Sequence, residues 1–396
     1  MKQIGLALVG STGVIGKVHI DAINQIDSCR LVGVNARTQE PLRAQATELG
    51  VKQYSTLDGV LADSEVDAVV IATPHPSHEE IALASIAAGK HLLIEKPLAV
   101  TPGESDRMVA AARSAGLKIG VTFNQRFRPQ ALKMRALIDE GAIGEIYRTS
   151  MITANFRSQD YYDRLAWRGT WNDEGGGALL NQGIHAIDLF QWVAGMPVAV
   201  FGALRSLKHK VEVEDYAGAM LEYENGALGT LHCDTVQAPG QQRIEVYGDD
   251  GALVMDGGSL TLHRLETPVQ EFMDNDKTIA FVSPDSKSET SEFEPAGNTH
   301  APCFDDFCRA LLDGGEPLVT AKRVRAARNS SPRSRCPAAG RRKSPCLSIA
   351  TSTMPCWPNC GRRGGCLWRK VTYSIDRAKT IPARRSIAIS AFFGDY

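Results

Sequence analysis

Three glycines mark the first place in the chain where residue types and spacing suggest chemistry, within Gly10-Ser11-Thr12-Gly13-Val14-Ile15-Gly16. The run lies between an apolar segment, Ile4–Val9, and a helical pattern that begins at Val14. Such a turn brings backbone amides and the positive end of a helix close to a pyrophosphate. The spacing is not the usual Gly-x-Gly-x-x-Gly, so the motif alone also fits a merely tight turn. Its strand–turn–helix context favours a dinucleotide site formed by Gly10, Ser11, Thr12, Gly13, Val14 and Ile15.

The end of the second apolar segment bears on which dinucleotide would bind. An NAD site usually carries an acid about 20 residues beyond the glycines, where it binds the ribose hydroxyls. Here Ala36 takes that place and Arg37 follows it. A guanidinium can pair with a 2′-phosphate and no carboxylate repels it, so the sequence leans slightly towards NADP over NAD. The alternative is that Arg37 is solvated and Asn35 binds the ribose.

Lys96 and His185 are two side chains of a type that can transfer protons. Lys96 comes just after an apolar run, at the strand end where open α/β sheets bind ligands. His185 lies in an apolar helical segment, Ile184–Val193. Oxidation of a secondary alcohol needs one group that removes the hydroxyl proton and another that stabilises the charge on oxygen. A lone lysine is usually solvated, however, and a histidine on an apolar helix is usually structural.

The elements that would position these residues fall into two parts. In residues 1–123, short runs that are apolar throughout alternate with helical patterns at Val14–Ile26, Glu79–Ala88 and Glu104–Ala115. Such strands are typical of a parallel sheet that is covered on both faces. We therefore expect a Rossmann-type doubly wound domain that binds NAD(P). The apolar runs are Ile4–Val9, Arg30–Val34, Val66–Ala72, His91–Ile94 and Lys118–Phe123.

Beyond residue 123 the pattern changes to runs in which apolar and polar residues alternate. Hairpin signals such as Glu224-Asn225-Gly226 and Asp249-Asp250-Gly251 separate these runs, and a last helix is expected at Cys303–Leu312. The pattern predicts an open, mostly antiparallel sheet with helices on one face. We assign residues 124–325 to this α+β domain, with substrate binding and oligomerisation as its expected roles.

Composition limits the class of protein. The 396 residues are 43% apolar and 22% charged with a net charge of −1, which gives no reason to expect nucleic acid or an anionic membrane as partner. No apolar stretch approaches the ~20 residues that cross a bilayer. Four scattered cysteines before residue 326 suggest a reducing compartment, and we expect a cytoplasmic protein without a metal site.

Several short motifs follow the ends of the predicted elements in a definite order. They are Ala72-Thr73-Pro74 with His78, Glu95-Lys96-Pro97, Asn124-Gln125-Arg126-Phe127, Trp167-Arg168, Gly175-Gly176-Gly177, and Asn181-Gln182-Gly183-Ile184-His185 with Asp188. Each is short, but their order and spacing over residues 4–320 together are specific. The chain resembles the glucose–fructose oxidoreductase / inositol dehydrogenase / rhizopine catabolism (Gfo/Idh/MocA) family.

This resemblance implies an NAD(P)-dependent oxidoreductase that transfers a hydride between the nicotinamide and a secondary alcohol of a sugar, cyclic polyol or sugar derivative. It assigns the proton-transfer chemistry to Lys96 and His185: Lys96 hydrogen-bonds the reacting hydroxyl and His185 takes its proton. It further implies a homodimer or tetramer formed through the second sheet. The expected cofactor residues beyond the glycine turn are Asn35, Arg37, Ala72, Thr73, Pro74, His78, Glu95, Lys96 and Asn124.

The expected substrate residues are Arg126, Trp167, Arg168, Asn181, His185 and Asp188. Many family members carry Asp at position 181, where it orients the histidine; Asn181, four residues before His185 on the same predicted helical face, cannot act as a base. It can still bind substrate hydroxyls. Asp188 binds substrate or polarises the histidine ring, or else faces a neighbouring loop. Trp167 and Arg168 form a wall of the substrate pocket or, equally, pack between the domains.

Two other functions remain open. One is a non-catalytic sensor or regulator that keeps the dinucleotide fold without turnover. The other is an aldose- or imine-reducing enzyme of the same family.

The last stretch of the chain, 326–396, differs from everything before it. From Arg328 onward it carries 14 Lys and Arg against two acids, and five of the nine cysteines lie there. The residues before Arg328 therefore carry a net charge of −13. A basic disordered arm is one interpretation and a metal site at Cys356, Cys360 and Cys366 another, but the cysteine spacing is irregular and no histidine is present.

The genetic code favours a third interpretation, a frameshift near residues 325–328. When the last base of each codon is read with the first two of the next, Cys356-Trp357 encodes only Leu and Trp357-Pro358 only Ala. At the other positions the shifted codon allows more than one amino acid. The allowed residues include a sequence that forms an amphipathic helix, a short strand and another helix, which resembles the usual end of family members. Coding DNA in which no one- or two-base change opens this frame would exclude the hypothesis.

Overall fold

The computed structural model describes residues 2–275, 280–294 and 297–321. The predicted tail at 326–396, with its frameshift and cysteine-site hypotheses, lies outside the described residues.

The first sheet has six parallel strands in the order β3-β2-β1-β4-β5-β6. The strand order reverses between β1 and β4, and such a switch point is where doubly wound sheets bind ligands. Gly10 follows β1 and Ala72 follows β4, so the glycine turn lies at this point. The strands are β1 (Ile4–Val9), β2 (Cys29–Asn35), β3 (Lys52–Tyr54), β4 (Ala68–Ile71), β5 (His91–Ile94) and β6 (Ile119–Val121).

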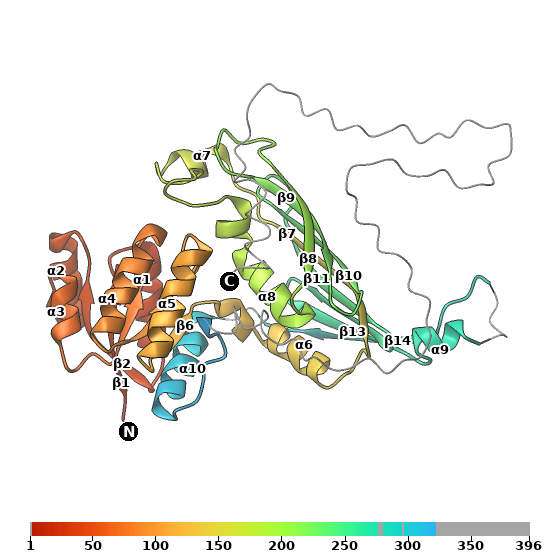
Figure 1. The fold of residues 1–396 in the computed structure, drawn as a ribbon, viewed down its shortest axis with the longest axis horizontal. Helices are drawn as coiled ribbons and strands as arrows, with labels where there is room; N and C mark the ends of the chain where they lie inside the picture. Colours follow the sequence, from red (N-terminus) through yellow and green to blue (C-terminus); the bar gives the residue numbers. More distant parts are fainter. Residues whose placement is uncertain (1, 276–279, 295–296, 322–396) are drawn as a thin grey trace. The chain divides into compact units, whose positions relative to one another are not determined.

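Helices cover both faces of this sheet (Figure 1). Alternate residues of β1 enter different cores: Ala7 and Val9 pack with the helices at 57–62, 78–87 and 102–114, and Leu6 and Leu8 pack with those at 14–23, 39–49 and 300–312. The expected doubly wound domain is therefore confirmed. The helices are α1 (Val14–Ile23), α2 (Gln39–Leu49), α3 (Leu57–Ala62), α4 (His78–Ala87) and α5 (Pro102–Ser114), with the short turn η1 (His75–Ser77) before α4.

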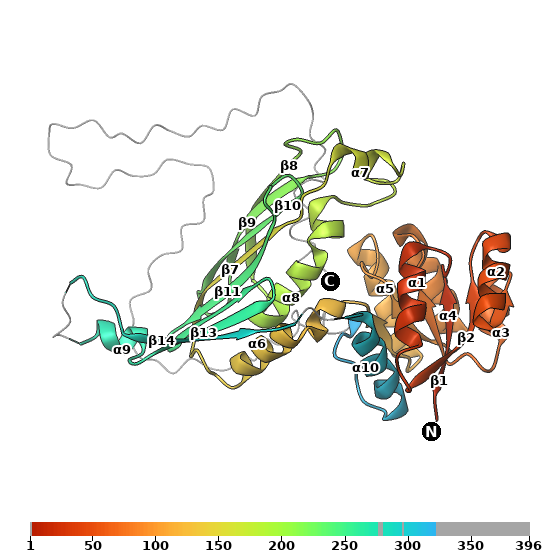
Figure 2. The same cartoon turned by 180° about the vertical axis from the view of Figure 1, so that it is seen from behind.

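The second sheet has eight strands in the order β14-β13-β12-β11-β7-β10-β9-β8, and all neighbours are antiparallel except β7 and β10. One face packs against α6 (Pro129–Asp139) and α8 (Ile184–Ala194) in a single apolar core. Both views show these two helices on the same side of the sheet (Figures 1 and 2). The predicted mostly antiparallel sheet is confirmed. Its strands are β7 (Ile146–Ala154), β8 (Ala199–Arg205), β9 (Tyr216–Glu222), β10 (Leu228–Asp234), β11 (Gln241–Gly248), β12 (Gly251–Asp256), β13 (Ser259–Leu265) and β14 (Ser286–Glu292).

The remaining helices follow β6 in the chain. They are η2 (Asn124–Phe127), α6 (Pro129–Asp139), α7 (Gln159–Asp163), the π-helical turn η3 (Ala178–Gln182), α8 (Ile184–Ala194), α9 (Val269–Met273) and α10 (His300–Leu312). Phe304 and Phe307 of α10 are fully buried in the core of the first sheet, although α10 lies in the chain after the second. The boundaries at residues 123 and 325 stay predictions. Among the described residues, no helix is long and apolar enough to cross a membrane.

Candidate active site

The backbone itself requires two of the three glycines in the turn after β1. Gly10 has a φ of +92°, and a Cβ there would lie 2.5 Å from the carbonyl oxygen of Ala72. A Cβ on Gly16 would lie 2.4 Å from the carbonyl oxygen of Ser11. Gly13 is exposed, and its nearest such contact is 3.4 Å away. No protein atom crowds Gly13, so packing within the protein does not explain a glycine there. A glycine at this position suits a ligand that comes close to the backbone at the start of α1.

The predicted ribose end of the site is polar and open. Ser11 is buried, and its Oγ has no hydrogen-bond partner in the described chain. Asn35 donates from Nδ2 to the carbonyl oxygen of Tyr54 at 2.8 Å, which fixes its side chain at the end of β2. Arg37 is exposed beside it, and Val14 at the start of α1 is 88% exposed.

Glu95 lies directly after β5 as a buried carboxylate. His19 of α1 contacts its Oε1 through Nε2 at 2.8 Å, and the backbone N–H of Lys96 donates to Oε2 at 3.0 Å. Burial by itself would raise the pKa of Glu95, but the bond from His19 and the charge of Lys96 lower it to about 2. Glu95 is therefore an anion at neutral pH, next to the predicted catalytic lysine.

Asn124 of η2 is held by the start of α10. Its Nδ2 donates to Oγ1 of Thr299 at 2.6 Å, and its buried Oδ1 has no partner in the described chain. A buried acceptor without a partner is costly unless a ligand completes it. Asn124 therefore suits its predicted contact with a cofactor.

Lys96 reaches from the end of β5 to the segment before α8. Its Nζ donates to the carbonyl oxygen of Asn181 at 3.4 Å. Burial lowers the pKa of Lys96, while the charges of Glu95 and Glu174 oppose that change. The ammonium thus lies in a poorly hydrated place between two carboxylates, where it can donate to a reacting oxygen.

His185 lies near the start of α8. Burial, together with the charge of Lys96, lowers the pKa of His185 to about 3, so its ring is neutral at pH 7. Its Nδ1 is buried without a partner in the described chain, and the ring packs edge-on against Phe123 with centroids 6.0 Å apart. A neutral imidazole can accept a proton, whereas an imidazolium cannot.

Aromatic and cationic side chains lie around Tyr161, whose hydroxyl is 3.5 Å from Nδ2 of Asn181. The guanidinium of Arg168 lies 3.9 Å from the ring centroid of Tyr161, and its Nη1 donates to the carbonyl oxygen of the same tyrosine at 2.7 Å. Trp167 is 37% exposed, with its ring 6.3 Å from that of His75 after β4. Trp167 thus touches the first domain and still offers a free face, so both predicted roles stay possible.

Two family models match most of the described chain. The model of the oxidoreductase family with an NAD-binding Rossmann fold matches residues 4–123, and that of the GFO/IDH/MocA C-terminal domain matches residues 131–254. Inositol 2-dehydrogenase 2 of Saccharopolyspora erythraea is 31% identical over 334 residues, 82% of this chain and 86% of that relative. The chain belongs to the Gfo/Idh/MocA family.

Other members are similar over comparable lengths. Levoglucosan dehydrogenase of Pseudarthrobacter phenanthrenivorans is 29% identical over 289 residues, 64% of this chain and 74% of that enzyme. The WlbA dehydrogenase of Bordetella pertussis, solved with NADH and UDP-GlcNAcA, has a TM-score of 0.67 and 29% identity over 81% of this chain and 92% of its own. The expected class of protein, an NAD(P)-dependent oxidoreductase, is confirmed.

Three residues of this Gfo/Idh/MocA chain do not have the contacts that a ligand-binding role requires. His78 is fully buried; its Nδ1 contacts the carbonyl oxygen of Pro97 at 3.0 Å and its Nε2 that of Thr73 at 2.9 Å. Since both ring nitrogens face backbone carbonyl oxygens of the fold, His78 joins the loops after β4 and β5 and its ring does not face a cofactor. The other two residues, Arg126 and Asp188, bind each other.

Arg126 of η2 and Asp188 of α8 form a buried bidentate ion pair. Nε donates to Oδ2 at 2.7 Å and Nη2 to Oδ1 at 2.6 Å, and the side chains are 3% and 5% exposed. The predicted contacts of both residues with substrate are not supported, because each uses its charge on the other. The pair instead fixes α8, with His185, against η2, with Asn124.

Replacing Arg126 by methionine is expected to destabilise the fold by about 3–5 kcal/mol, because it leaves the Asp188 carboxylate buried without its partner. Urea unfolding measures this loss. Arg309→Met is the matched control: it breaks an exposed pair with Asp305 on α10 and should cost at most about 0.5 kcal/mol. An Arg126→Met variant as stable as the control would contradict this role of the pair.

Asn181 and His185 do not share one helix, contrary to the sequence-based expectation. Asn181 lies in the turn η3, and α8 begins only after Gly183. A Cβ on Gly183 would lie 2.4 Å from Sγ of Cys233, so close packing on the second sheet explains this glycine. The spacing of four residues therefore gives no common helical face here.

Sequence reasoning missed two carboxylates that shape this turn. Glu214 is buried and accepts from the N–H groups of Gly177 and Leu179, both within 3.1 Å. Burial raises the pKa of Glu214 to about 7. Glu174 bonds the side chain of Asn181 itself. Neither lies in a motif that marks it, since each acts through contacts that only the fold creates.

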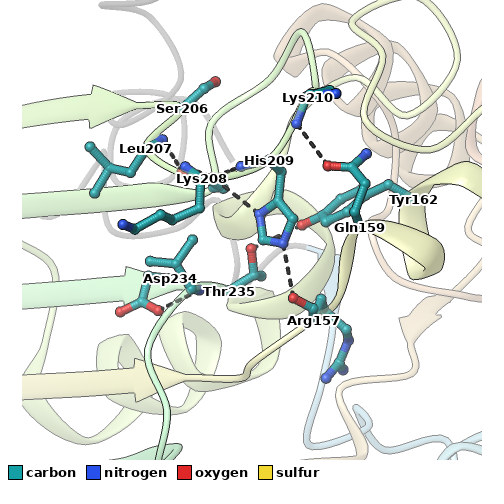
Figure 3. A network of polar contacts seen from close by, with 12 residues as sticks. Arg157, Gln159, Tyr162, Ser206, Leu207, Lys208, His209, Lys210, Asp234 and Thr235 are labelled. Atoms are coloured by element: carbon teal, nitrogen blue, oxygen red, sulfur yellow. Dashed lines mark hydrogen bonds and ion pairs between the residues drawn. The ribbon is translucent and has the colours of Figure 1, made fainter.

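A polar network next to the turn η3 holds Arg157 in place. Nη2 of Arg157 donates to the side chain of Gln182, the last residue of that turn, at 2.7 Å. The ring of His209 contacts the carbonyl oxygen of Arg157 through Nε2 at 2.9 Å (Figure 3). Its Nδ1 contacts the buried carboxylate of Asp215, which also accepts from the backbone N–H groups of residues 207–209. The loop after β8 thus holds the segment that flanks the site.

Proposed function

We propose that this enzyme oxidises a secondary alcohol of a sugar, cyclic polyol or sugar derivative and transfers the hydride to NAD(P). The observation that carries the proposal is that Nζ of Lys96, after β5, reaches the carbonyl oxygen of Asn181 just before α8, while burial and the charge of Lys96 keep the ring of His185 in α8 neutral. The names of similar enzymes, an inositol and a levoglucosan dehydrogenase, support a polyhydroxylated substrate.

The residues present suit such a reaction. The turn 10–15 and the first amides of α1 would hold the pyrophosphate, and Asn124 Oδ1 would accept from a cofactor group. The bound nicotinamide supplies the hydride acceptor. Lys96 donates a hydrogen bond to the substrate oxygen, which stabilises its developing charge, and His185 takes the hydroxyl proton.

We infer a slight preference for NADP. Arg37 is exposed at the end of β2, and Ala36 leaves no carboxylate there to repel a 2′-phosphate. The NADH in the Bordetella pertussis structure shows that the family fold also accepts the other cofactor. Titration of the protein fluorescence with NADPH and NADH compares the two directly, and tighter binding of NADH would reverse the preference.

We further propose a cytoplasmic homodimer or tetramer formed through the second sheet. Phe201, Met220 and Leu228 lie on the sheet face away from α6 and α8, and each is more than half exposed. Such an apolar patch marks an interaction surface. All four described cysteines are buried free thiols, as expected in a reducing compartment.

A panel of polyols and sugars, followed at the nicotinamide absorbance with each cofactor, tests the proposed function. Reduction of the nicotinamide by at least one polyol is the expected result. Cofactor binding without reduction by any polyol or sugar would favour a sensor. Oxidation of NADPH by aldoses or imines, without the alcohol reaction, would favour the reductase.

A further inference from the structure

Glu174 is a buried carboxylate close to the proposed catalytic lysine. Its side chain accepts from the backbone N–H of Gly169 at 2.6 Å and from Nδ2 of Asn181, and the residue is 1% exposed. The carbonyl oxygen of Asn181 in turn accepts from Nζ of Lys96 at 3.4 Å. A continuous chain of contacts thus runs from the Glu174 carboxylate through Asn181 to Lys96.

We propose that Glu174 is a positioning residue for the reaction: its negative charge keeps Lys96 protonated, and its bond to Asn181 fixes how that amide faces the substrate. The inference rests on the proposed function of Lys96. Asn181 alone cannot supply this charge, because an amide is neutral. Glu95 is the other anion near Lys96, but its carboxylate is already engaged by His19 and the Lys96 backbone.

The contact with Glu174 also determines the orientation of the Asn181 amide. A carboxylate only accepts hydrogen bonds, so the NH2 group of Asn181 must face Glu174. The Tyr161 hydroxyl lies on the same side, 3.5 Å from Nδ2. Oδ1 of Asn181 is then left to accept from a substrate hydroxyl, beside the ammonium that donates to the reacting oxygen.

The hydrogen bonds of Glu174 suit an ionised carboxylate, because both of its oxygens accept from N–H groups, Oε2 from Gly169 and Oε1 from Asn181. Burial raises the pKa of Glu174 above its ordinary value, and these bonds together with the charges of Arg168 and Lys96 oppose that rise. Conversely, Glu174 is one of two carboxylates that oppose the lowering of the pKa of Lys96 by burial. Removing its charge should therefore lower the pKa of Lys96 further.

A charge-swap series tests the proposal. Glu174→Gln keeps the shape but leaves one acceptor oxygen for two N–H donors, so kcat should fall by about 10- to 100-fold. The alkaline limb of the pH profile should also move to lower pH. In Glu174→Gln/Asn181→Asp, the glutamine donates to the new carboxylate and still accepts from Gly169. This double variant should recover most of the kcat and the alkaline limb.

Asp173→Asn is the matched control, because it removes an exposed carboxylate next in sequence and should leave kcat and its pH profile unchanged. Thermal melting and NADPH binding verify that each variant is folded. An unchanged pH profile in Glu174→Gln, or a double variant no better than the single one, would overturn the proposal.

A second readout does not depend on turnover. The unprotonated lysine reacts with acetic anhydride, so the rate of Lys96 acetylation at pH 8, followed by peptide mass spectrometry, reports its protonation. Glu174→Gln should raise this rate severalfold, while the rate at the exposed Lys133 stays constant. If no polyol is oxidised but this rate rises, the proposed function fails and the electrostatic role of Glu174 stands. An unchanged rate overturns that role whatever the activity.

Discussion

Replacing Lys96 by methionine is expected to lower kcat by about 10²- to 10⁴-fold, with little change in the affinity for NADPH. Methionine replaces the aliphatic part of the side chain but has no N–H, so the oxygen of the reacting alcohol loses the donor that stabilises its charge. The loss belongs to kcat because this charge develops only in the transition state. Steady-state rates and a fluorescence titration of NADPH measure the two effects separately.

The matched control is Lys133→Met, which removes an exposed lysine whose Nζ bonds only Ser291 among the described residues. Its kcat should equal that of the parent enzyme. A Lys96→Met variant with kcat near the parent value would remove Lys96 from the mechanism. A variant that loses NADPH affinity and keeps kcat would make Lys96 a cofactor-binding residue only.

The first sheet could be predicted closely because its strands are buried on both faces. The segment expected at His91–Ile94 is β5 itself, and those expected at Arg30–Val34 and Lys118–Phe123 differ from β2 and β6 by one or two residues at each end. A strand covered on both faces must be apolar throughout, which leaves a clear pattern. Lys96 stands out for the same reason, since it follows such a strand at the edge where ligands bind.

The residues whose surroundings differ from the sequence-based expectation depend on packing between segments far apart in the chain. Arg126 and Asp188 are 62 residues apart, and a charged residue beside a conspicuous motif resembles a ligand-binding one until its partner is seen. The spacing of Asn181 and His185 suggested one helical face, but Asn181 lies in the π-helical turn η3 and α8 begins only at Ile184. Spacing rules hold only within one regular element.

Glu174 shows a related limit. The residue precedes three glycines, and nothing in the local sequence distinguishes it from the exposed Asp173 beside it. Only the turn η3 brings Asn181 back onto its carboxylate. Lys96 and His185 could thus be proposed as catalytic residues from the sequence and its family resemblance, whereas the contacts of Glu174 with Asn181 come from tertiary structure.

Replacing His185 by alanine is expected to lower kcat for alcohol oxidation by about 10²- to 10⁴-fold, because the hydroxyl proton then has no base to accept it. Added imidazole should restore part of the rate through the space that the ring leaves. His263→Ala, which removes a histidine from β13 of the second sheet, is the matched control and should leave kcat unchanged.

The pH dependence gives a sharper test of His185. A general base must be unprotonated to act. The value of kcat therefore falls only when the pH drops below the pKa of that base. Burial and the Lys96 charge lower the pKa of His185 to about 3, so kcat should not fall as the pH decreases from 8 to 5. The contrary outcome is a fall in kcat below about pH 6.5 in the parent enzyme that is also present in Lys96→Met. It would mean that the His185 ring is hydrated and remote from the ammonium. That result would contradict the arrangement on which the proposed proton transfer depends.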